Sequence, residues 1–211
     1  MVKSFVFMIT AFDIERMIKM DEIGVIHGRF QVLHNDHMKY LLAGKKLCKH
    51  LIIGICNPEI ELTKYTASNP HRSKKSSNPM TFFERLECIR NALIEVGVPR
   101  NEFEIVPFPI NFPDRLFNYV PLSATFYMTI YDEWGSEKYK MLKEELNLNV
   151  KVMWNVPIEE KGISASDIRS YIYQDKDWKH MVPNSVYKYI KENKIDKRIK
   201  SYLTDEKGEN L

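Results

Sequence analysis

One stretch of this chain is the most informative about its fold, Gly28-Arg29-Phe30-Gln31-Val32-Leu33-His34-Asn35-Asp36-His37. An apolar run of strand character, residues 23–26, precedes it, and good helix formers, residues 38–43, follow it. The two histidines therefore lie where a strand turns into a helix. A helix N-terminus presents free N–H groups and the positive end of the helix dipole, and both favour phosphate. The stretch predicts a triphosphate site to which the two imidazoles and Arg29 contribute.

Outward from this turn, apolar strand-like runs alternate with helical patterns. Strands are predicted at 23–28, 51–56, 103–106, 124–128 and 150–154. Helices are predicted at 36–48, after Thr81, around 139–146, after Ser164 and at 183–192. This alternation predicts an α/β fold, Rossmann-like, with a mostly parallel sheet and helices on both faces. In such folds ligands bind at the carboxyl ends of the strands, where the histidine turn lies.

The remaining segments suggest one domain with appendages. Residues 1–20 are expected to form an N-terminal extension, 21–200 a single domain and 201–211 a polar tail that frays from residue 204. The polar stretch 57–79 is long enough to be functional. Its basic run 71–75 is either a solvated loop or a lid that closes on phosphate, and the lysines between 188 and 200 are expected on an exposed face.

Composition narrows the class of protein. The chain has 211 residues and a net charge of +3, which does not argue for nucleic acid or an anionic membrane as partner. The apolar run 5–12 is too short for a membrane span, and charged residues follow it at once. Three widely spaced cysteines, Cys48, Cys56 and Cys88, are expected to be reduced thiols in a cytoplasmic protein.

Taken alone, the His34-x-x-His37 pair has two ordinary explanations. It could be half of a metal site, because two imidazoles at this spacing can converge, or it could be a surface accident. No glutamate accompanies the pair as in H-E-x-x-H, and the sequence offers no evident third ligand. We therefore expect no protein-bound metal.

Context favours another reading of the pair. Residues 28–37 resemble G-x-F-x-P-x-H-x-G-H, and residues 163–169 resemble I-S-x-T-x-x-R, the two signatures of the α/β nucleotidyltransferase superfamily. Residues 78–85 and 183–190 resemble two further elements of the archaeal-type nicotinamide mononucleotide adenylyltransferases. The four segments keep the order and spacing of that family over residues 21–195, so the single domain is expected to be of nucleotidyltransferase type.

The resemblance implies a reaction. Members of the superfamily join a nucleoside triphosphate to a phosphate-bearing acceptor by in-line attack on the α-phosphorus, and pyrophosphate leaves. Catalysis by positioning and charge stabilisation suffices, without a protein nucleophile. The expected partners are ATP and a mononucleotide acceptor, Mg²⁺ is expected to arrive with the ATP, and a homo-oligomer is expected.

The resemblance also assigns roles to residues by position. The catalytic group is His34, His37 and Arg169. The nucleotide-binding group is Gly28, Arg29, Phe30, Ser164, Ser166 and Arg85. Two of these have simpler alternatives, since Ser164 could be only a helix N-cap and Arg85 could pair with Glu84 or Glu87 on its own helix. For the acceptor, the candidates are Asn111, Phe117 and Trp134, although the two aromatic rings could equally belong to the core.

The chain departs from the family pattern at three places. Val32 replaces the usual proline, and Asp36 replaces the glycine of H-x-G-H. The Asp36 carboxylate could be directed away from the triphosphate, could help to hold Mg²⁺ or could mark weakened activity. The G-N-[SP] turn of the archaeal enzymes and their stacking tryptophan are also missing, and residues 129–134 and 111–117 stand in their places.

The leading functional hypothesis is an adenylyltransferase that makes a dinucleotide from ATP and nicotinamide or nicotinate mononucleotide. A second hypothesis keeps the fold and changes the substrates, to CTP with a phosphorylated polar alcohol or to ATP with phosphopantetheine. A third is a nucleotide-binding sensor that retains the pocket without turnover.

Overall fold

The computed structural model describes residues 20–59, 74–160 and 162–208. Residues 1–19 of the predicted extension and 71–73 of the basic run lie outside the described residues.

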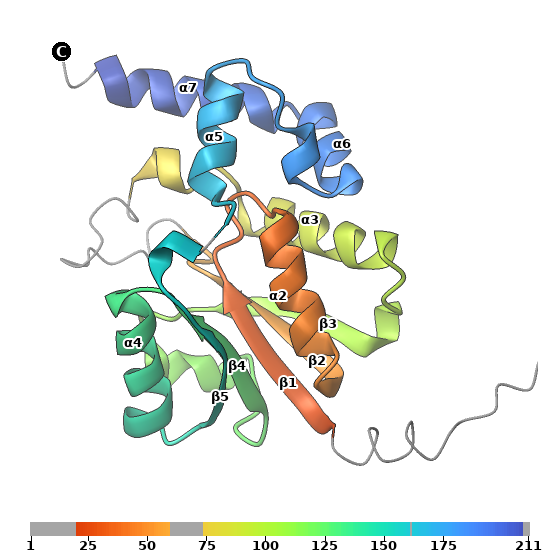
Figure 1. Cartoon of the computed structure of the whole chain (residues 1–211), viewed down its shortest axis with the longest axis vertical. Helices are drawn as coiled ribbons and strands as arrows, with labels where there is room; N and C mark the ends of the chain where they lie inside the picture. Colours follow the sequence, from red (N-terminus) through yellow and green to blue (C-terminus); the bar gives the residue numbers. More distant parts are fainter. Residues whose placement is uncertain (1–19, 60–73, 161, 209–211) are drawn as a thin grey trace, which may run out of the picture.

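Five parallel strands form one sheet in the order β3-β2-β1-β4-β5 (Figure 1). The strands are β1 (Asp21–Gly28), β2 (Cys48–Cys56), β3 (Phe103–Phe108), β4 (Thr125–Ile130) and β5 (Asn149–Asn155). The chain adds β2 and β3 on one side of β1 and then crosses to add β4 and β5 on the other. The order therefore reverses between β1 and β4, and such a reversal opens a crevice at the carboxyl ends of the two strands.

Helices cover both faces of the sheet. The α-helices are α2 (Asn35–Lys45), α3 (Phe82–Glu95), α4 (Glu133–Lys140), α5 (Ala165–Tyr173), α6 (Asn184–Glu192) and α7 (Ile195–Gly208). The π-helical turn η6 (Met141–Glu145) continues α4. Short 3-10 helices are η3 (Lys75–Ser77), η4 (Arg100–Glu102), η5 (Pro113–Asn118), η7 (Ile158–Glu160) and η8 (Lys179–Met181). Figure 1 shows α5, α6 and α7 gathered beyond the carboxyl end of β1.

Alternation along the strands divides the apolar side chains between two cores. On β1, Ile26 belongs to a buried apolar cluster with residues of α2, α3, α5, α6 and α7, whereas its neighbour Val25 belongs to a second cluster with Leu116 of η5 and Leu142 of η6. Each face of the sheet thus has its own apolar layer and its own covering helices. The predicted Rossmann-like α/β fold is confirmed.

Two of the predicted helix starts are confirmed with their chemistry. Thr81 caps α3: its hydroxyl accepts from the Glu84 N–H, and Glu84 accepts from the Thr81 N–H at 2.9 Å. Ser164 and Asp167 form the same reciprocal box at the start of α5. Each box satisfies N–H groups that a helix N-terminus leaves without partners.

One predicted helix end is wrong, and one helix extends beyond the residues expected. Helix α2 ends at Lys45 and not near residue 48, because β2 begins at Cys48 to pair with β1 from Asp21 onward. Residues 204–208, expected to be frayed, continue helix α7. That helix forms because Ile195 and Ile199 bury their side chains against the larger core.

The three cysteines are buried and form no disulfide, as predicted. In the part of the chain that the structure describes, no helix is long and apolar enough to cross a membrane.

Candidate active site

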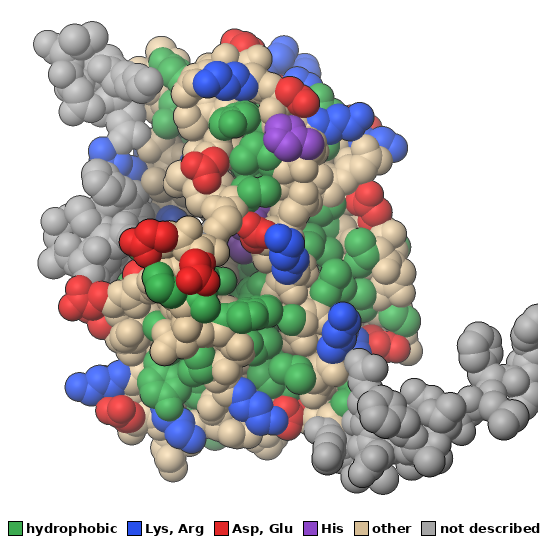
Figure 2. Space-filling view, viewed as in Figure 1, with side chains coloured by type: hydrophobic (Ala, Val, Ile, Leu, Met, Phe, Trp, Pro, Cys, Tyr) green, Lys and Arg blue, Asp and Glu red, His purple; other side chains and the backbone are tan. Residues whose placement is uncertain are grey.

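A cavity of about 760 Å³ opens at the carboxyl ends of β1, β4 and β5. Its walls come from the three connections that follow these strands, so it occupies the crevice where the strand order reverses. Figure 2 shows histidine atoms in a recess near the middle of this face, beside acidic and basic side chains. Eight residues predicted from the sequence line the cavity: Gly28, Arg29, Phe30, His34, His37, Trp134, Ser164 and Ser166.

The two histidines stack on each other, with ring centroids 3.6 Å apart and planes 22° apart. His34 is also the N-cap of α2, because its Nδ1 accepts a hydrogen bond of 3.2 Å from the His37 N–H. An Nδ1 atom that accepts carries no proton, so the proton of the neutral ring sits on Nε2. The cap therefore leaves His34 with an Nε2–H donor suited to a phosphate oxygen.

The end of β1 shapes the neighbouring wall. Phe30 adopts a positive φ of 52° and its ring meets His37 edge-on, with centroids 5.0 Å apart. A Cβ added at Gly28 would lie 2.8 Å from the Phe30 ring. Only glycine at position 28 therefore lets the phenyl ring fold back beside the histidines.

The start of α5 forms the opposite wall. Ser164 is the N-cap of α5, which was the simpler alternative from the sequence, and its hydroxyl donates to Asp167 at 2.7 Å. The Ser166 hydroxyl accepts from Arg169 Nη2 at 3.0 Å and keeps its own O–H for donation. The cavity thus lies between two helix N-termini, those of α2 and α5, which both favour anions.

Arg169 and Arg85, expected from the sequence to bind phosphate, are not among the residues that line the cavity. Arg169 is 6% exposed and donates to the Gln31 carbonyl and to the Ser166 hydroxyl. Arg85 is 1% exposed and donates to the carbonyls of Thr81, Arg29, Cys56 and Asn57 at 2.7–3.2 Å. Both guanidinium groups therefore donate to backbone carbonyls of the surrounding chain.

The alternative pairing of Arg85 within its own helix is not formed either. Glu84 pairs with Arg198 and Glu87 pairs with Arg90. Burial lowers the pKa of Arg85 to about 10, so the side chain remains a cation at neutral pH.

A third brace holds the loop that joins β1 to α2. The Gln31 side chain accepts from the Met80 N–H and donates to the Met80 carbonyl, both at 2.8 Å. Arg85 holds the Arg29 carbonyl and Arg169 holds the Gln31 carbonyl of the same loop. The loop that carries the cavity wall is therefore tied to the segment before α3, to α3 itself and to α5.

Asp36 lies in the cavity wall, and its carboxylate has two partners. Oδ2 accepts from the Ile163 N–H at 2.6 Å, and Oδ1 forms an ion pair of 2.5 Å with Lys39. Partial burial alone would raise the pKa of Asp36, but Lys39 and the Ile163 N–H hold that pKa below its usual value. The carboxylate is therefore charged and engaged at neutral pH.

The acceptor candidates separate in space. Trp134, at the start of α4, lines the cavity, and the Lys138 ammonium lies 6.0 Å from its ring centroid. Asn111 and Phe117, the other two candidates, are not among the residues that line it. Asn111 Nδ2 donates to Asn57 Oδ1 at 3.4 Å, and Phe117 is 40% exposed on η5, whose Leu116 belongs to the apolar cluster of Val25.

Several lining residues were missed in the sequence, among them His27, Tyr40, Tyr131, Lys138 and Trp154. Each lies at or just after the carboxyl end of a strand or on the helix that follows it. This position relative to a strand end is the feature of the sequence that could have indicated them, but many core residues share it. Tyr40 is held by a hydrogen bond of 2.9 Å to the Tyr127 carbonyl.

Among the described residues, no three His, Cys, Asp or Glu side chains gather as a metal site would require.

The sequence of the chain is similar to those of known protein families. Residues 25–171, more than half of the chain, match the family model described as cytidylyltransferase-like. The chain belongs to this family. It is a nucleotidyltransferase, as the four sequence motifs implied, and the matched region contains the histidine turn, the Gln31–Met80 brace and the start of α5.

Within the family the chain resembles proteins of two activities. It is 42% identical to a phosphonoformate cytidylyltransferase of Streptomyces viridochromogenes, over 84% of this chain and 95% of that protein. It is 34% identical to a nicotinamide-nucleotide adenylyltransferase of Thermococcus sibiricus, over 88% of this chain and 92% of that protein. Further archaeal enzymes of the second kind match at about 30%, including one from Thermococcus kodakarensis.

The fold also matches a solved structure. A bifunctional NMN adenylyltransferase/ADP ribose pyrophosphatase from Francisella tularensis superposes with a TM-score of 0.59 and 17% identity. The match covers 86% of this chain and 52% of that one, so the chain spans about half of the bifunctional protein. At this identity the likeness concerns the nucleotidyltransferase fold alone.

Proposed function

We propose that the protein is a cytidylyltransferase that joins CTP to a small phosphonate or phosphate acceptor and releases pyrophosphate. The observation that carries the proposal is the 42% identity with a phosphonoformate cytidylyltransferase over 95% of that enzyme's length. This was the second hypothesis from the sequence, with the acceptor class now changed to a small phosphonate.

The placement of the acceptor candidates supports a small acceptor. Of the three residues proposed to hold a mononucleotide, only Trp134 lines the cavity, while Asn111 and Phe117 lie away from it. The chain also lacks the turn and the stacking tryptophan of the archaeal adenylyltransferases. Adenylyl transfer from ATP to nicotinamide or nicotinate mononucleotide is the second candidate, favoured by the relative at 34% identity.

The reaction needs no covalent enzyme intermediate. A phosphonate oxygen attacks the α-phosphorus of the nucleotide in line, a new P–O bond forms, and the bond from the α-phosphorus to the bridging oxygen breaks. The electron pair leaves with pyrophosphate. Negative charge grows on the α-phosphate oxygens and on the leaving group, so catalysis requires donors fixed in advance around those oxygens.

The cavity offers such donors on two sides. In our proposal His34 Nε2–H and His37 contact the triphosphate at the start of α2, and Gly28, Arg29 and Phe30 line the nucleotide pocket. The Ser166 hydroxyl and the N–H groups in the first turn of α5 hold the β- and γ-phosphates, while Ser164, whose hydroxyl donates to Asp167, caps that helix. Arg169 acts indirectly, because its guanidinium group orients the Ser166 hydroxyl and the Gln31 carbonyl.

Mg²⁺ fits this arrangement as a companion of the triphosphate. The Asp36 carboxylate is engaged by Ile163 and Lys39, and the described residues contain no acidic cluster to form a cage. The ion would be held by phosphate oxygens and water, as is common for Mg²⁺, and would neutralise phosphate charge.

The test is pyrophosphate release from CTP or ATP with Mg²⁺, each paired with phosphonoformate, nicotinamide mononucleotide, nicotinate mononucleotide or phosphopantetheine. The highest kcat/KM is expected for CTP with phosphonoformate. A higher value for ATP with either mononucleotide would replace this proposal with the second candidate. Tight nucleotide binding with no pyrophosphate release from any pair would favour the sensor.

A further inference from the structure

Asp36 connects two parts of the site that lie far apart in sequence. It is in the first turn of α2, between the two histidines, and its Oδ2 accepts from the Ile163 N–H at 2.6 Å, 127 residues away. Ile163 comes directly before Ser164, the N-cap of α5. One carboxylate therefore fastens the entry of α5 to the first turn of α2.

The residue before Ile163 is matched to this carboxylate. Gly162 has a positive φ of 44°, and a Cβ added there would lie 2.3 Å from Asp36 Oδ2. Real Cβ atoms do not approach an oxygen so closely. Any side chain at position 162 would therefore displace either the carboxylate or the segment that it holds, so the Asp36 contact depends on this glycine.

Both oxygens of the Asp36 carboxylate are engaged by other groups of the protein. One oxygen binds the Ile163 N–H, and the other binds the ammonium of Lys39 one turn further along α2. The negative charge is compensated by this cation and by the N–H group, and it also lies at the positive end of the α2 dipole. Asp36 can therefore stand beside the triphosphate region without presenting a bare charge to it.

We propose that Asp36 is a positioning residue that sets the spacing between the two anion-binding helix N-termini. The proposal rests on the proposed function in one respect, namely that phosphates bind between α2 and α5. Asp36 itself touches no substrate. It acts by holding Ile163, and through Ile163 the Ser164 and Ser166 wall, at a fixed distance from His34 and His37.

The experiment compares Asp36→Ala, Asp36→Asn, Gly162→Ala and the double variant Asp36→Ala/Gly162→Ala. Affinity for CTP and for ATP is measured by calorimetry, together with the nucleotide KM, the acceptor KM and the melting temperature. The control is Glu22→Ala, which removes a carboxylate with an equally short ion pair, 2.5 Å to Lys49, at the amino end of β1.

Asp36→Ala is expected to weaken nucleotide binding about tenfold, the size of a lost charged hydrogen bond, with the acceptor KM unchanged. Asp36→Asn is expected to stay within about threefold of wild type, because its amide oxygen still accepts from Ile163 and an exposed ion pair contributes little. Gly162→Ala should weaken nucleotide binding about as much as Asp36→Ala does. Added to Asp36→Ala, it should weaken nucleotide binding less than it does in the wild-type protein. Glu22→Ala should bind nucleotide as wild type does.

Three results would overturn the proposal. The first is equal or tighter nucleotide binding by Asp36→Ala, because the carboxylate would then oppose the triphosphate. The second is equal damage by Asp36→Asn and Asp36→Ala, which would make the charge the active property. The third is strict additivity of the Asp36 and Gly162 changes. Failure of every acceptor to turn over would reject the proposed function alone, because nucleotide affinity and melting temperature need no acceptor.

Discussion

At the scale of single residues, His34 combines two tasks in one ring. Nδ1 caps helix α2 by accepting from the His37 N–H, and this leaves the proton on Nε2. Asparagine is among the best N-cap residues and can accept through its side-chain oxygen in the same way. The two tasks can therefore be separated by substitution.

We expect His34→Asn and His34→Ala to lower kcat to a similar extent, by about 100-fold or more, because both lose the phosphate donor. His34→Asn should remain more stable than His34→Ala by about 1 kcal/mol, the value of an N-cap. Urea unfolding and steady-state kinetics on both variants check this. An active His34→Asn enzyme would mean that the ring serves only as a cap.

His27 illustrates a titratable group kept neutral by its surroundings. The side chain is 6% exposed, stacks on Phe108 with centroids 4.8 Å apart, and its Nδ1 has no hydrogen-bond partner among the described residues. Burial lowers the pKa of His27 to about 3, and the Lys138 charge acts in the same direction. Protonation is therefore strongly disfavoured in the folded protein.

The direction of the resulting pH dependence follows from the difference in proton binding between the folded and the unfolded chain. Below the ordinary pKa of 6.5 the unfolded chain binds a proton at His27 and the folded chain does not. The contribution of His27 to the free energy of unfolding therefore has its full value above pH 6.5. It decreases by about 1.4 kcal/mol per pH unit as the pH falls toward 3. His27→Phe should flatten this part of the curve, measured by urea unfolding between pH 7 and pH 5. Equal slopes in both proteins would contradict the assignment.

At the scale of elements, the loop between β1 and α2 is held by arginines aimed at backbone carbonyls. Arg85 reaches back from α3 to a carbonyl of this loop, that of Arg29, to the Thr81 carbonyl before α3, and to two carbonyls at the carboxyl end of β2, those of Cys56 and Asn57. A buried carbonyl without a donor is costly, and the guanidinium group has enough N–H donors to serve several at once.

Arg85→Met should therefore destabilise the protein by about 3 kcal/mol or more, since several buried acceptors lose their donor together. Arg100→Met is the control, because its ion pair with Glu104 is about half exposed and such a pair contributes about 1 kcal/mol or less. Urea unfolding measures both. A loss as small as that of Arg100→Met would show that water or another side chain replaces Arg85.

Most elements could be predicted from the sequence, since their causes are local. The capping boxes at Thr81 and Ser164 join residues three apart, and the apolar period of each helix reveals its buried side. The end of α2 could not be predicted, because the pairing of β2 with β1 competes with helix formation at residues 46–48. Helix α7 was missed because its buried isoleucines lie within a lysine-rich stretch.

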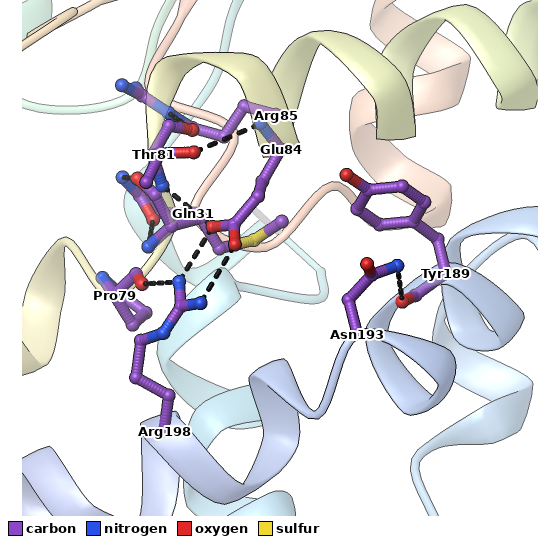
Figure 3. Close-up of polar contacts among 9 residues, drawn as sticks. Gln31, Pro79, Thr81, Glu84, Arg85, Tyr189, Asn193 and Arg198 are labelled. Atoms are coloured by element: carbon purple, nitrogen blue, oxygen red, sulfur yellow. Dashed lines mark hydrogen bonds and ion pairs between the residues drawn. The ribbon is translucent and has the colours of Figure 1, made fainter.

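At the scale of the whole molecule, α7 connects the carboxyl-terminal part of the chain to the site. Figure 3 shows Arg198 of α7 directed at Glu84 of α3 and at the Pro79 carbonyl, next to the Gln31 side chain. The guanidinium group donates to both Glu84 oxygens, at 2.7 and 2.9 Å, and to Pro79 at 3.1 Å. Met80, the next residue, holds Gln31, so the contact extends into the loop of the cavity wall.

Arg198→Ala should lower the free energy of unfolding at pH 7 by about 1 kcal/mol, because this bidentate pair is only partly buried. Burial tends to raise the pKa of Glu84, but Arg198 and the Thr81 N–H hold that pKa below its usual 4.5. The stabilisation is therefore present above pH 4.5 and is lost as the pH falls through the lower folded value. Urea unfolding of wild type, Arg198→Ala, Glu84→Gln and the double variant checks this, and additive losses would mean that no coupling exists.

The candidate site was predicted in part. The histidines, the end of β1 and the two serines lie at the cavity because short motifs place them at turns whose position in an α/β fold is general. Arg85, Arg169, Asn111 and Phe117 were assigned by type and by position in a motif. Their actual places depend on which carbonyls or side chains lie near them after the sheet and helices pack.

The sequence by itself determined the alternation of strands and helices, the caps and the anion-favouring turn at residues 34–37, because these arise from neighbours within one turn or strand. Only the tertiary structure decided where the charges are directed. The contacts of Asp36 with Ile163, Arg169 with Gln31 and Arg198 with Glu84 each join residues more than 100 positions apart. No local pattern specifies such a pair, since its partners meet only after the apolar faces of the sheet and helices have been buried.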